Sequence, residues 1–158
     1  MVTWATTCNW KMLESLNELF ARDLRKLKKE ISSYSSEENI WSCTTGINNS
    51  GGNLTLHLIG NLKHFIGAIL GNTAYIRERE LEFSMKNVPV NEIRDHIDET
   101  IAVIDDVLTQ LNPTDLQRKY PIDVFRKPMT TEFFLLHLST HLNYHLGQIN
   151  YHRRLLDK

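Results

Sequence analysis

The stretch His137-Leu-Ser-Thr-His141-Leu-Asn-Tyr-His145-Leu-Gly-Gln148 carries the pattern that decides the fold. Its apolar residues recur at intervals of three and four positions, which is the period of an amphipathic helix. The pattern extends from an N-cap at Thr130 or Thr131 to about Leu156. The same stripe includes Phe134, Leu138, Tyr144, Ile149 and His152. We therefore expect one long helix whose histidines face the core.

Three segments upstream show the same helical period. Their apolar stripes consist of Leu13, Leu16, Phe20, Leu24, Leu27 and Ile31; of Leu54, Leu58, Leu62, Phe65 and Ile69; and of Ile93, Ile97, Ile101, Ile104, Leu108 and Leu111. Helices with one apolar stripe each predict an all-α four-helix bundle, because every stripe can then face a shared interior. A chain of 158 residues is expected to form one domain over positions 1–158. A helical solenoid would need a fixed sequence repeat, which we do not find.

The segments between these helices differ in composition. Residues 32–53 are rich in Ser, Asn and Gly and predict a long loop between the first two helices. We expect Asn53 to cap the second helix and Gly71-Asn72 to end it. Residues 116–129 contain two prolines among weakly alternating apolar residues, so a short hairpin or extended connection is expected before the last helix.

Composition excludes several classes of function. The formal net charge is -1, which gives no electrostatic footprint for nucleic acid or for an anionic membrane. The N-terminal residues lack the basic and apolar regions of a signal peptide, and no apolar run has the length of a membrane span. Cys8 and Cys43 are too few for a disulfide framework and are expected to be reduced thiols. We expect a cytoplasmic protein with no nucleic-acid or membrane partner.

The histidine spacing is that of a metal site. His141 and His145 are four residues apart and therefore lie one turn above each other on a single helical face. Catalytic zinc usually takes three protein ligands. The third donor could be His57 or His64 of the second helix, His96 of the third, or His137 or His152 of the fourth. We choose His57 because it lies between Leu54 and Leu58 near the inner face, whereas His96 stands in a charged run. The alternative is a set of core histidines that are hydrogen-bonded and bind no metal.

Two histidine strings also resemble a known family. His141-x-x-x-His145-x-Gly147-Gln148-Ile149 and Leu56-His57-Leu58-Ile59-Gly60-Asn61 resemble the DinB-like (DinB/YfiT) superfamily of four-helix-bundle metalloproteins, and Arg77-Glu-Arg79 with Glu82-Phe83 adds to the likeness. The resemblance covers about positions 13–154 and implies that His57, His141 and His145 hold a divalent metal. Four residues are candidates for orienting these ligands or touching a substrate: Asn61, His137, Gln148 and Arg77.

The smaller details of these strings also allow predictions. Successive steps of four residues drift by roughly 40° around a helix, so His137 is expected to support the site and not to join it. We interpret Gly147 as a point of close helix packing. The Arg77-Glu78-Arg79-Glu80 run is expected to be a solvated surface, with an arginine that grips an anionic substrate as the alternative.

The resemblance implies a metal-dependent enzyme, most plausibly a thiol S-transferase that uses a low-molecular-weight thiol on a small-molecule substrate; a hydrolase is the other enzymatic possibility. Imidazole accepts several metals, of which zinc or nickel is expected here. The histidine strings contain no Asp or Glu that would serve as a general base. The alternative is a non-catalytic, stress-associated protein that binds metal or a ligand, and the sequence leaves both open.

The oligomeric state can also be predicted from the helical stripes. The first and third helices carry extra apolar residues, namely Met12, Leu19, Val103 and Val107. Such residues would lie outside the core stripes and could meet a second copy of the chain. Together with the family resemblance, they predict a homodimer formed through helix faces.

Overall fold

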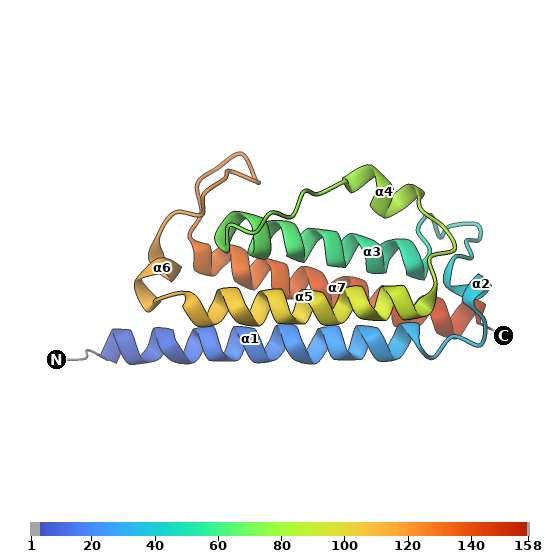
Figure 1. Ribbon diagram of the computed structural model, residues 1–158, viewed down its shortest axis with the longest axis horizontal. Coiled ribbons are helices and arrows are strands. Elements are labelled where there is room, and N and C mark those ends of the chain that lie inside the picture. Colours follow the sequence, from blue (N-terminus) through green and yellow to red (C-terminus); the bar gives the residue numbers. More distant parts are fainter. Residues whose placement is uncertain (1–3, 158) are drawn as a thin grey trace.

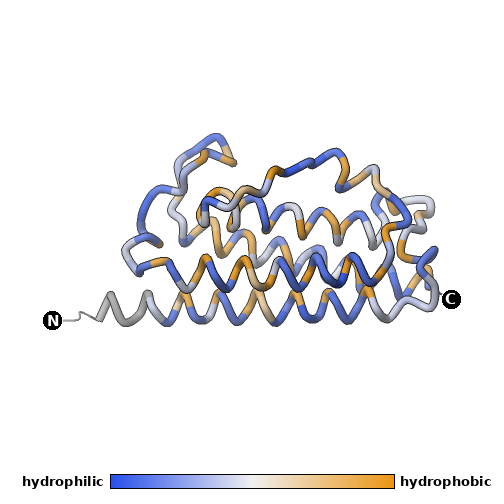
Figure 2. The backbone as a smooth tube through the Cα atoms, in the orientation of Figure 1, coloured by the Kyte–Doolittle hydropathy of each residue, from blue (hydrophilic) through white to orange (hydrophobic). Residues whose placement is uncertain are grey.

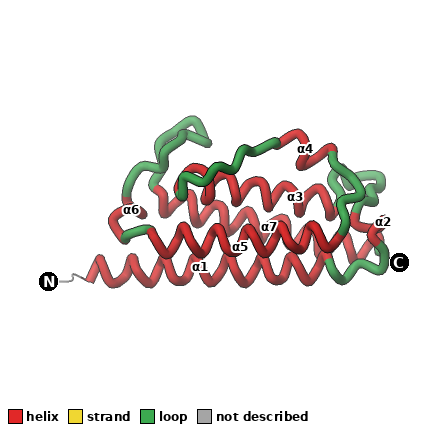
Figure 3. Tube along the Cα trace, in the orientation of Figure 1, coloured by secondary structure: helices red, strands yellow, loops and turns green. Residues whose placement is uncertain are grey.

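Four long helical segments form the body of the protein in the computed structural model, which describes residues 4–157 and their side chains from residue 10 onward (Figure 1). They are α1 (Trp4–Ile31), α3 (Gly51–Leu62) with its π-helical continuation η1 (Lys63–Leu70), α5 (Val90–Gln110) and α7 (Thr131–Leu156). Helix α1 packs against α5 and α7, and α3 packs against α7 and α5. Figure 3 shows helices and loops but no strand over the described residues. The predicted all-α four-helix bundle is confirmed.

The apolar stripes meet in one core. Leu16, Phe20 and Leu24 of α1 are almost fully buried, as are Leu138 and Ile149 of α7. Figure 2 shows apolar residues recurring along each long helix, in agreement with the predicted period. None of the described helices combines the length and apolar composition needed to cross a membrane.

Three short helices lie in the connections. They are α2 (Glu37–Ile40), α4 (Arg79–Ser84) and α6 (Pro113–Gln117). Helices α2 and α6 lie at opposite ends of the bundle, whereas α4 lies over α3 (Figure 1). The expected hairpin before α7 is reduced to an isolated antiparallel bridge between Lys119 and Thr130, supported by a 2.9 Å hydrogen bond from Tyr120 N to Met129 O.

Helix α3 begins earlier than the sequence predicted. Ser50 is its N-cap, and the Ser50 hydroxyl accepts the Asn53 N–H at 3.1 Å. The prediction of Asn53 as N-cap was therefore wrong. The two glycines at the start of the helix are tightly packed, since a Cβ on Gly52 would lie 2.6 Å from the Trp41 ring. Asn53 instead donates from Nδ2 to Glu82 O at 3.0 Å and to Met85 O at 2.9 Å, which ties α4 to α3.

The second half of this helix is wider than an α-helix. In η1 the Gly71 N–H bonds to Ile66 O, five residues back, and Tyr120 Oη donates to Phe65 O at 2.7 Å. An added Cβ on Gly67 would lie 2.9 Å from Val103 of α5. The Tyr120 hydrogen bond and the close approach of α5 accompany the π-helical turn, which the apolar period alone does not distinguish from an α-helical one.

Candidate metal centre

Three histidines from two helices meet at one point. His57 comes from α3, and His141 and His145 come from successive turns of α7. The His57 Nε2 atom lies 3.4 Å from His141 Nε2, which lies 3.1 Å from His145 Nε2. One nitrogen from each ring lies within 4.8 Å of the other two. His57 is buried and the other two rings are half-buried, so the cluster is shielded by the bundle.

The opposite ring nitrogens of two of these histidines have hydrogen-bond acceptors. His57 Nδ1 lies 2.9 Å from the Glu82 carboxylate, and His145 Nδ1 lies 2.6 Å from Gln148 Oε1. An ionised carboxylate and an amide oxygen can only accept, so each Nδ1 carries the proton. In the neutral rings, Nε2 of His57 and of His145 then carries a lone pair directed toward the third histidine.

This arrangement fits a bound cation. A neutral His141 could donate its single Nε2 proton to only one of its two neighbours, and the other lone pair would be left without a donor. Zinc bound by imidazole at about 2.1 Å in a tetrahedral site separates its nitrogen ligands by about 3.4 Å. The two nitrogen separations measured here, 3.4 and 3.1 Å, are close to that value. The donor set can therefore hold a divalent metal ion.

The surroundings keep these rings in the form that binds metal. Burial, reinforced by repulsion from His145, His57 and His137, lowers the pKa of His141 to about 4. Burial also lowers the pKa of His145, although its hydrogen bond to Gln148 acts in the opposite direction. Both rings are therefore neutral at pH 7, and a neutral imidazole is the form that donates a lone pair to a metal.

A buried ion pair fixes the orientation of His57. Glu82 of α4 accepts from Arg77 Nε at 2.6 Å and from Arg77 Nη2 at 2.8 Å. Burial alone would raise the pKa of Glu82, but the hydrogen bonds from Arg77 and His57 outweigh it and lower the pKa. Glu82 reaches His57 across Gly60, where an added Cβ would lie 2.2 Å from Glu82 Oε1. Glu82 is thus held ionised against the Nδ1 proton of His57.

Glu82 was not predicted from the sequence as a functional residue. The Arg77 run was predicted to be a solvated surface, which was wrong for Arg77, because only 12% of its side chain is exposed. Arg77 Nε and Nη2 bind Glu82, and Nη2 also lies 3.4 Å from His57 Nδ1. The one sequence feature that could have pointed to Glu82 as a functional residue was the Glu82-Phe83 part of the family resemblance.

Two of the other candidates, Gln148 and His137, contact the clustered histidines. Gln148 binds His145 Nδ1, and its Nε2 donates to Tyr144 Oη at 3.3 Å. The His137 ring stacks on the His141 ring, with centroids 6.1 Å apart, and lies outside the cluster as expected. Asn61 is buried, and its Oδ1 has no hydrogen-bond partner among the described residues.

Three other histidines lie elsewhere in the protein. His64 lies in η1, where its ring meets that of Phe65 at 4.8 Å between centroids. His152 is engaged by Tyr34 Oη at Nδ1 and donates from Nε2 to Ser42 O, whereas His96 pairs with Glu92 and Glu99 on α5. The hydrogen-bond partners of His152 identify a structural role for it. His96 lies on the surface of another helix, in keeping with the charged run in which it stands.

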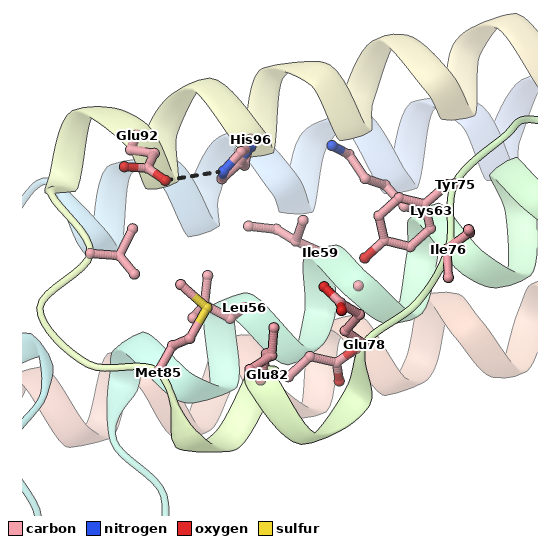
Figure 4. Close-up of a pocket in the computed structure, with 13 residues that line it drawn as sticks. Leu56, Ile59, Lys63, Tyr75, Ile76, Glu78, Glu82, Met85, Glu92 and His96 are labelled. Atoms are coloured by element: carbon pink, nitrogen blue, oxygen red, sulfur yellow. Dashed lines mark ion pairs between the residues drawn. The ribbon is translucent and has the colours of Figure 1, made fainter.

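A pocket of about 680 Å³ borders the cluster at His145 and Gln148. Its walls come from the 46–49 loop, the start of α3 and the C-terminal half of α7. A smaller pocket, of about 250 Å³, lies between α3, α4 and α5; Figure 4 shows apolar side chains such as Leu56 and Ile59 within it and the Glu92–His96 ion pair at its edge. Glu82 borders that second pocket, but none of the three clustered histidines does.

Gly147 and Tyr144 differ from their predicted roles. A Cβ added at Gly147 would meet nothing within 4 Å, so the interpretation of Gly147 as a close-packing position was wrong. Tyr144 is 64% exposed and does not belong to the buried stripe of α7. Both residues line the larger pocket.

The fold agrees with comparisons to known proteins. A family model described as the DinB superfamily matches residues 11–149. The crystal structure of a DinB-like protein from Bacillus cereus superposes with a TM-score of 0.70 at 18% sequence identity, covering 90% of this chain and 91% of the other. The search of curated proteins gave no match. Because the family model spans most of the sequence, the chain belongs to the DinB superfamily.

Proposed function

We propose that the protein is a divalent-metal-dependent enzyme, and specifically a thiol S-transferase. The observation that carries this proposal is the convergence of three imidazole Nε2 atoms beside an open pocket. His57, His141 and His145 would hold the ion, which we propose to be zinc or nickel. Such an ion would supply a Lewis acid that lowers the pKa of a thiol brought to it.

The residues around the three histidines orient the metal-binding rings. Glu82, fixed by Arg77, holds the Nδ1 proton of His57, and Gln148 holds that of His145, so both rings present Nε2 to the same point. Hydrogen bonds of this kind orient metal-binding histidines and raise their basicity. Glu82 is not a free general base, because its two carboxylate oxygens accept from Arg77 and His57.

In this class of reaction the only proton that must be removed is that of the thiol. The thiol sulfur forms a bond to an electrophilic carbon, a leaving group departs with its bonding electrons, and the thiol proton passes to solvent. Solvent reaches the larger pocket, since Tyr144 and Tyr151 on its wall are more than half exposed. A closed site would have favoured the alternative, a non-catalytic stress-associated protein that binds metal or a ligand, whereas an open pocket beside the histidines supports an enzyme.

The test uses untagged protein that is demetallated and then loaded with zinc or nickel. Mercaptoethanol, cysteine and glutathione are each supplied with chlorodinitrobenzene, and thioether formation is followed by absorbance. We expect metal-dependent turnover with at least one thiol, and a loss of about 100-fold or more in the His141→Ala variant, the scale seen when one strong electrostatic contribution is removed. Equal rates for the two proteins with every thiol would reject the transferase.

A further inference from the structure

The larger pocket is the least explained feature next to the histidine cluster. It borders His145 and Gln148, and it is wide enough for a small organic molecule at about 680 Å³. From the side chains that line it we infer which chemical class of co-substrate it accepts. This inference rests on the proposed function, because it assigns the substrate side of that same site.

The space beside Gly147, where a side chain would lie, is not filled by any other described residue. Glycine inside a helix is less stable than alanine by about 0.5–1 kcal/mol, so an interior glycine needs a reason. Close packing is not the reason, because an added Cβ would meet no atom within 4 Å. A positive φ is not the reason either, since Gly46 is the one glycine with positive φ in the described part of the chain. Gly147 instead widens the pocket between the two tyrosines of α7.

The pocket wall on α7 is aromatic. Tyr144 and Tyr151 are seven residues apart, hence on one face of the helix, and Gly147 lies between them. The two tyrosine side chains are 64% and 63% exposed, and neither belongs to the buried core. Exposed tyrosines on a concave surface offer flat apolar area together with a hydroxyl group, which suits a planar ligand.

The described side chains that line the pocket offer hydrogen bonds, but none of them is a Lys, Arg, Asp or Glu. Asn48 and Asn49 line it, and their side-chain amides form no hydrogen bond with another described residue, so they are available to a ligand. Both ring nitrogens of His152 are engaged by Tyr34 and Ser42. A cationic group entering this pocket would lose water without gaining a counter-charge, because no carboxylate lines it.

We propose that this pocket binds the second substrate, and that this substrate is an uncharged molecule with a flat apolar body and an amide, carbonyl or hydroxyl group. The body lies against Tyr144 and Tyr151, over Gly147. The polar group meets Asn48 and Asn49. Its reactive end then faces His145, at the edge of the candidate metal centre.

The test compares two fluorinated probes on zinc-loaded protein by fluorine NMR. The first is para-fluorobenzamide, which is neutral, and the second is para-fluorobenzylamine, which is cationic at pH 7. We expect the amide to bind about ten-fold more tightly or better, the factor that corresponds to ~1.4 kcal/mol. Tighter binding of the amine would overturn the assignment.

Matched variants locate the binding. Gly147→Leu fills the space between the tyrosines and should weaken amide binding about ten-fold, whereas Ala102→Leu, on the exposed face of α5, should leave it unchanged. Zinc content should be equal in all three proteins. Tyr151→Ala serves as a second variant that removes the wall without adding bulk, and it should also weaken binding. Unchanged affinity in both pocket variants would reject this location.

The zinc and amide measurements together distinguish failure of the pocket assignment from failure of the proposed function. If zinc binds and the amide does not, the pocket assignment fails while the metal site stands; if the amide binds and zinc does not, the proposed function fails and the pocket stands. Sedimentation of the same proteins tests a competing occupant. A dimer that Gly147→Leu dissociates would identify this face as a subunit contact and overturn the ligand assignment.

Discussion

At the scale of single residues, the central feature is a set of tautomers fixed from outside the cluster. Glu82 and Gln148 each accept the Nδ1 proton of a different histidine. The two Nε2 lone pairs then point at His141, and one neutral imidazole cannot satisfy both. A cation resolves this conflict, which is why the arrangement favours metal over a hydrogen-bonded core.

The first prediction concerns Glu82. Glu82→Gln removes the negative charge that polarises the Nδ1 proton of His57 and leaves Arg77 without its ionic partner. We expect zinc affinity to fall about 10–100-fold, the usual effect of removing such a supporting group. Competition with a chromogenic chelator measures the affinity. Glu80→Gln, an exposed position on the same helix, is the control, and equal affinity in the two variants would contradict the assigned role.

The sequence could predict only part of this site. His141 and His145 were recognisable because four-residue spacing places them on one helical face, and His57 because it lies in an apolar stripe. Glu82 lies 25 positions from His57 and reaches it only through the path of the chain around α3. Its helix has six residues, too few to display a period. Contacts of that kind depend on tertiary structure.

At the scale of the helices, two glycines within α-helices differ in the space around them. Gly60 is closely packed, whereas Gly147 is not. An alanine at Gly60 would place its Cβ 2.2 Å from Glu82 Oε1, whereas one at Gly147 would stand in open space. Glu82 cannot move aside freely, because Arg77 and His57 hold its carboxylate. The two positions therefore form a matched pair for substitution.

We predict opposite effects of alanine at these positions. Gly60→Ala should displace Glu82, lower stability by about 1–3 kcal/mol and weaken zinc binding. Gly147→Ala should raise stability by about 0.5–1 kcal/mol and leave zinc binding unchanged, because alanine restricts the unfolded chain and favours helix. Denaturant unfolding and a zinc titration of each variant measure these changes. Two variants with the same sign of stability change would be inconsistent with the packing described here.

The long helices were predictable because each repeats its apolar period over several turns. The π-helical turns of η1 were not, because they retain the same buried residues, such as Ile66, and differ only in backbone hydrogen bonding. The N-cap of α3 was misplaced by three residues. Ser50 precedes two glycines, which weaken the helical pattern in the sequence, and only their packing against Trp41 and Tyr34 explains an earlier start.

At the scale of the whole molecule, the shifted histidines link stability to pH. The pKa of His141 lies at about 4 in the folded protein, below its ordinary value of 6.5. Between those values the unfolded chain binds more protons than the folded protein. The stability contributed by neutral His141 is therefore complete above about pH 6.5 and is lost as the pH falls toward 4. The carboxylates with lowered pKa values, such as Glu82, act at lower pH, because their unfolded values are near 4.5.

Demetallated protein should consequently be less stable at pH 5 than at pH 7. We expect a difference on the order of 1–2 kcal/mol, less than the full shift would give, because the His141 ring is half-buried and partly screened by water. Denaturant unfolding at both pH values measures it. The His141→Gln variant should show a smaller difference, and a wild-type protein equally stable at both pH values would contradict the pKa assignment.

The homodimer stays a prediction, and the structure leaves fewer of the apolar residues on which it was based free to contact a second chain. Val107 is buried in the core and cannot serve as a contact, whereas Leu19 and Val103 are half-buried on α1 and α5. We expect a dimer in sedimentation at tens of micromolar, an order of magnitude typical of a weak complex. Leu19→Glu should dissociate it and Glu80→Lys should not. A wild-type monomer at that concentration would rule out a stable dimer.

The most direct test of the central claim is the zinc stoichiometry of untagged protein, measured by elemental analysis after demetallation and reloading at pH 7. We predict one zinc per chain for the wild type and for His96→Ala, which changes a partly exposed histidine of α5, and none for His141→Ala. Zinc at about 100 times its dissociation constant should also add ~2.7 kcal/mol of stability to the first two proteins and nothing to the third. Equal zinc content in the His141→Ala and His96→Ala variants would contradict a metal centre formed by His57, His141 and His145.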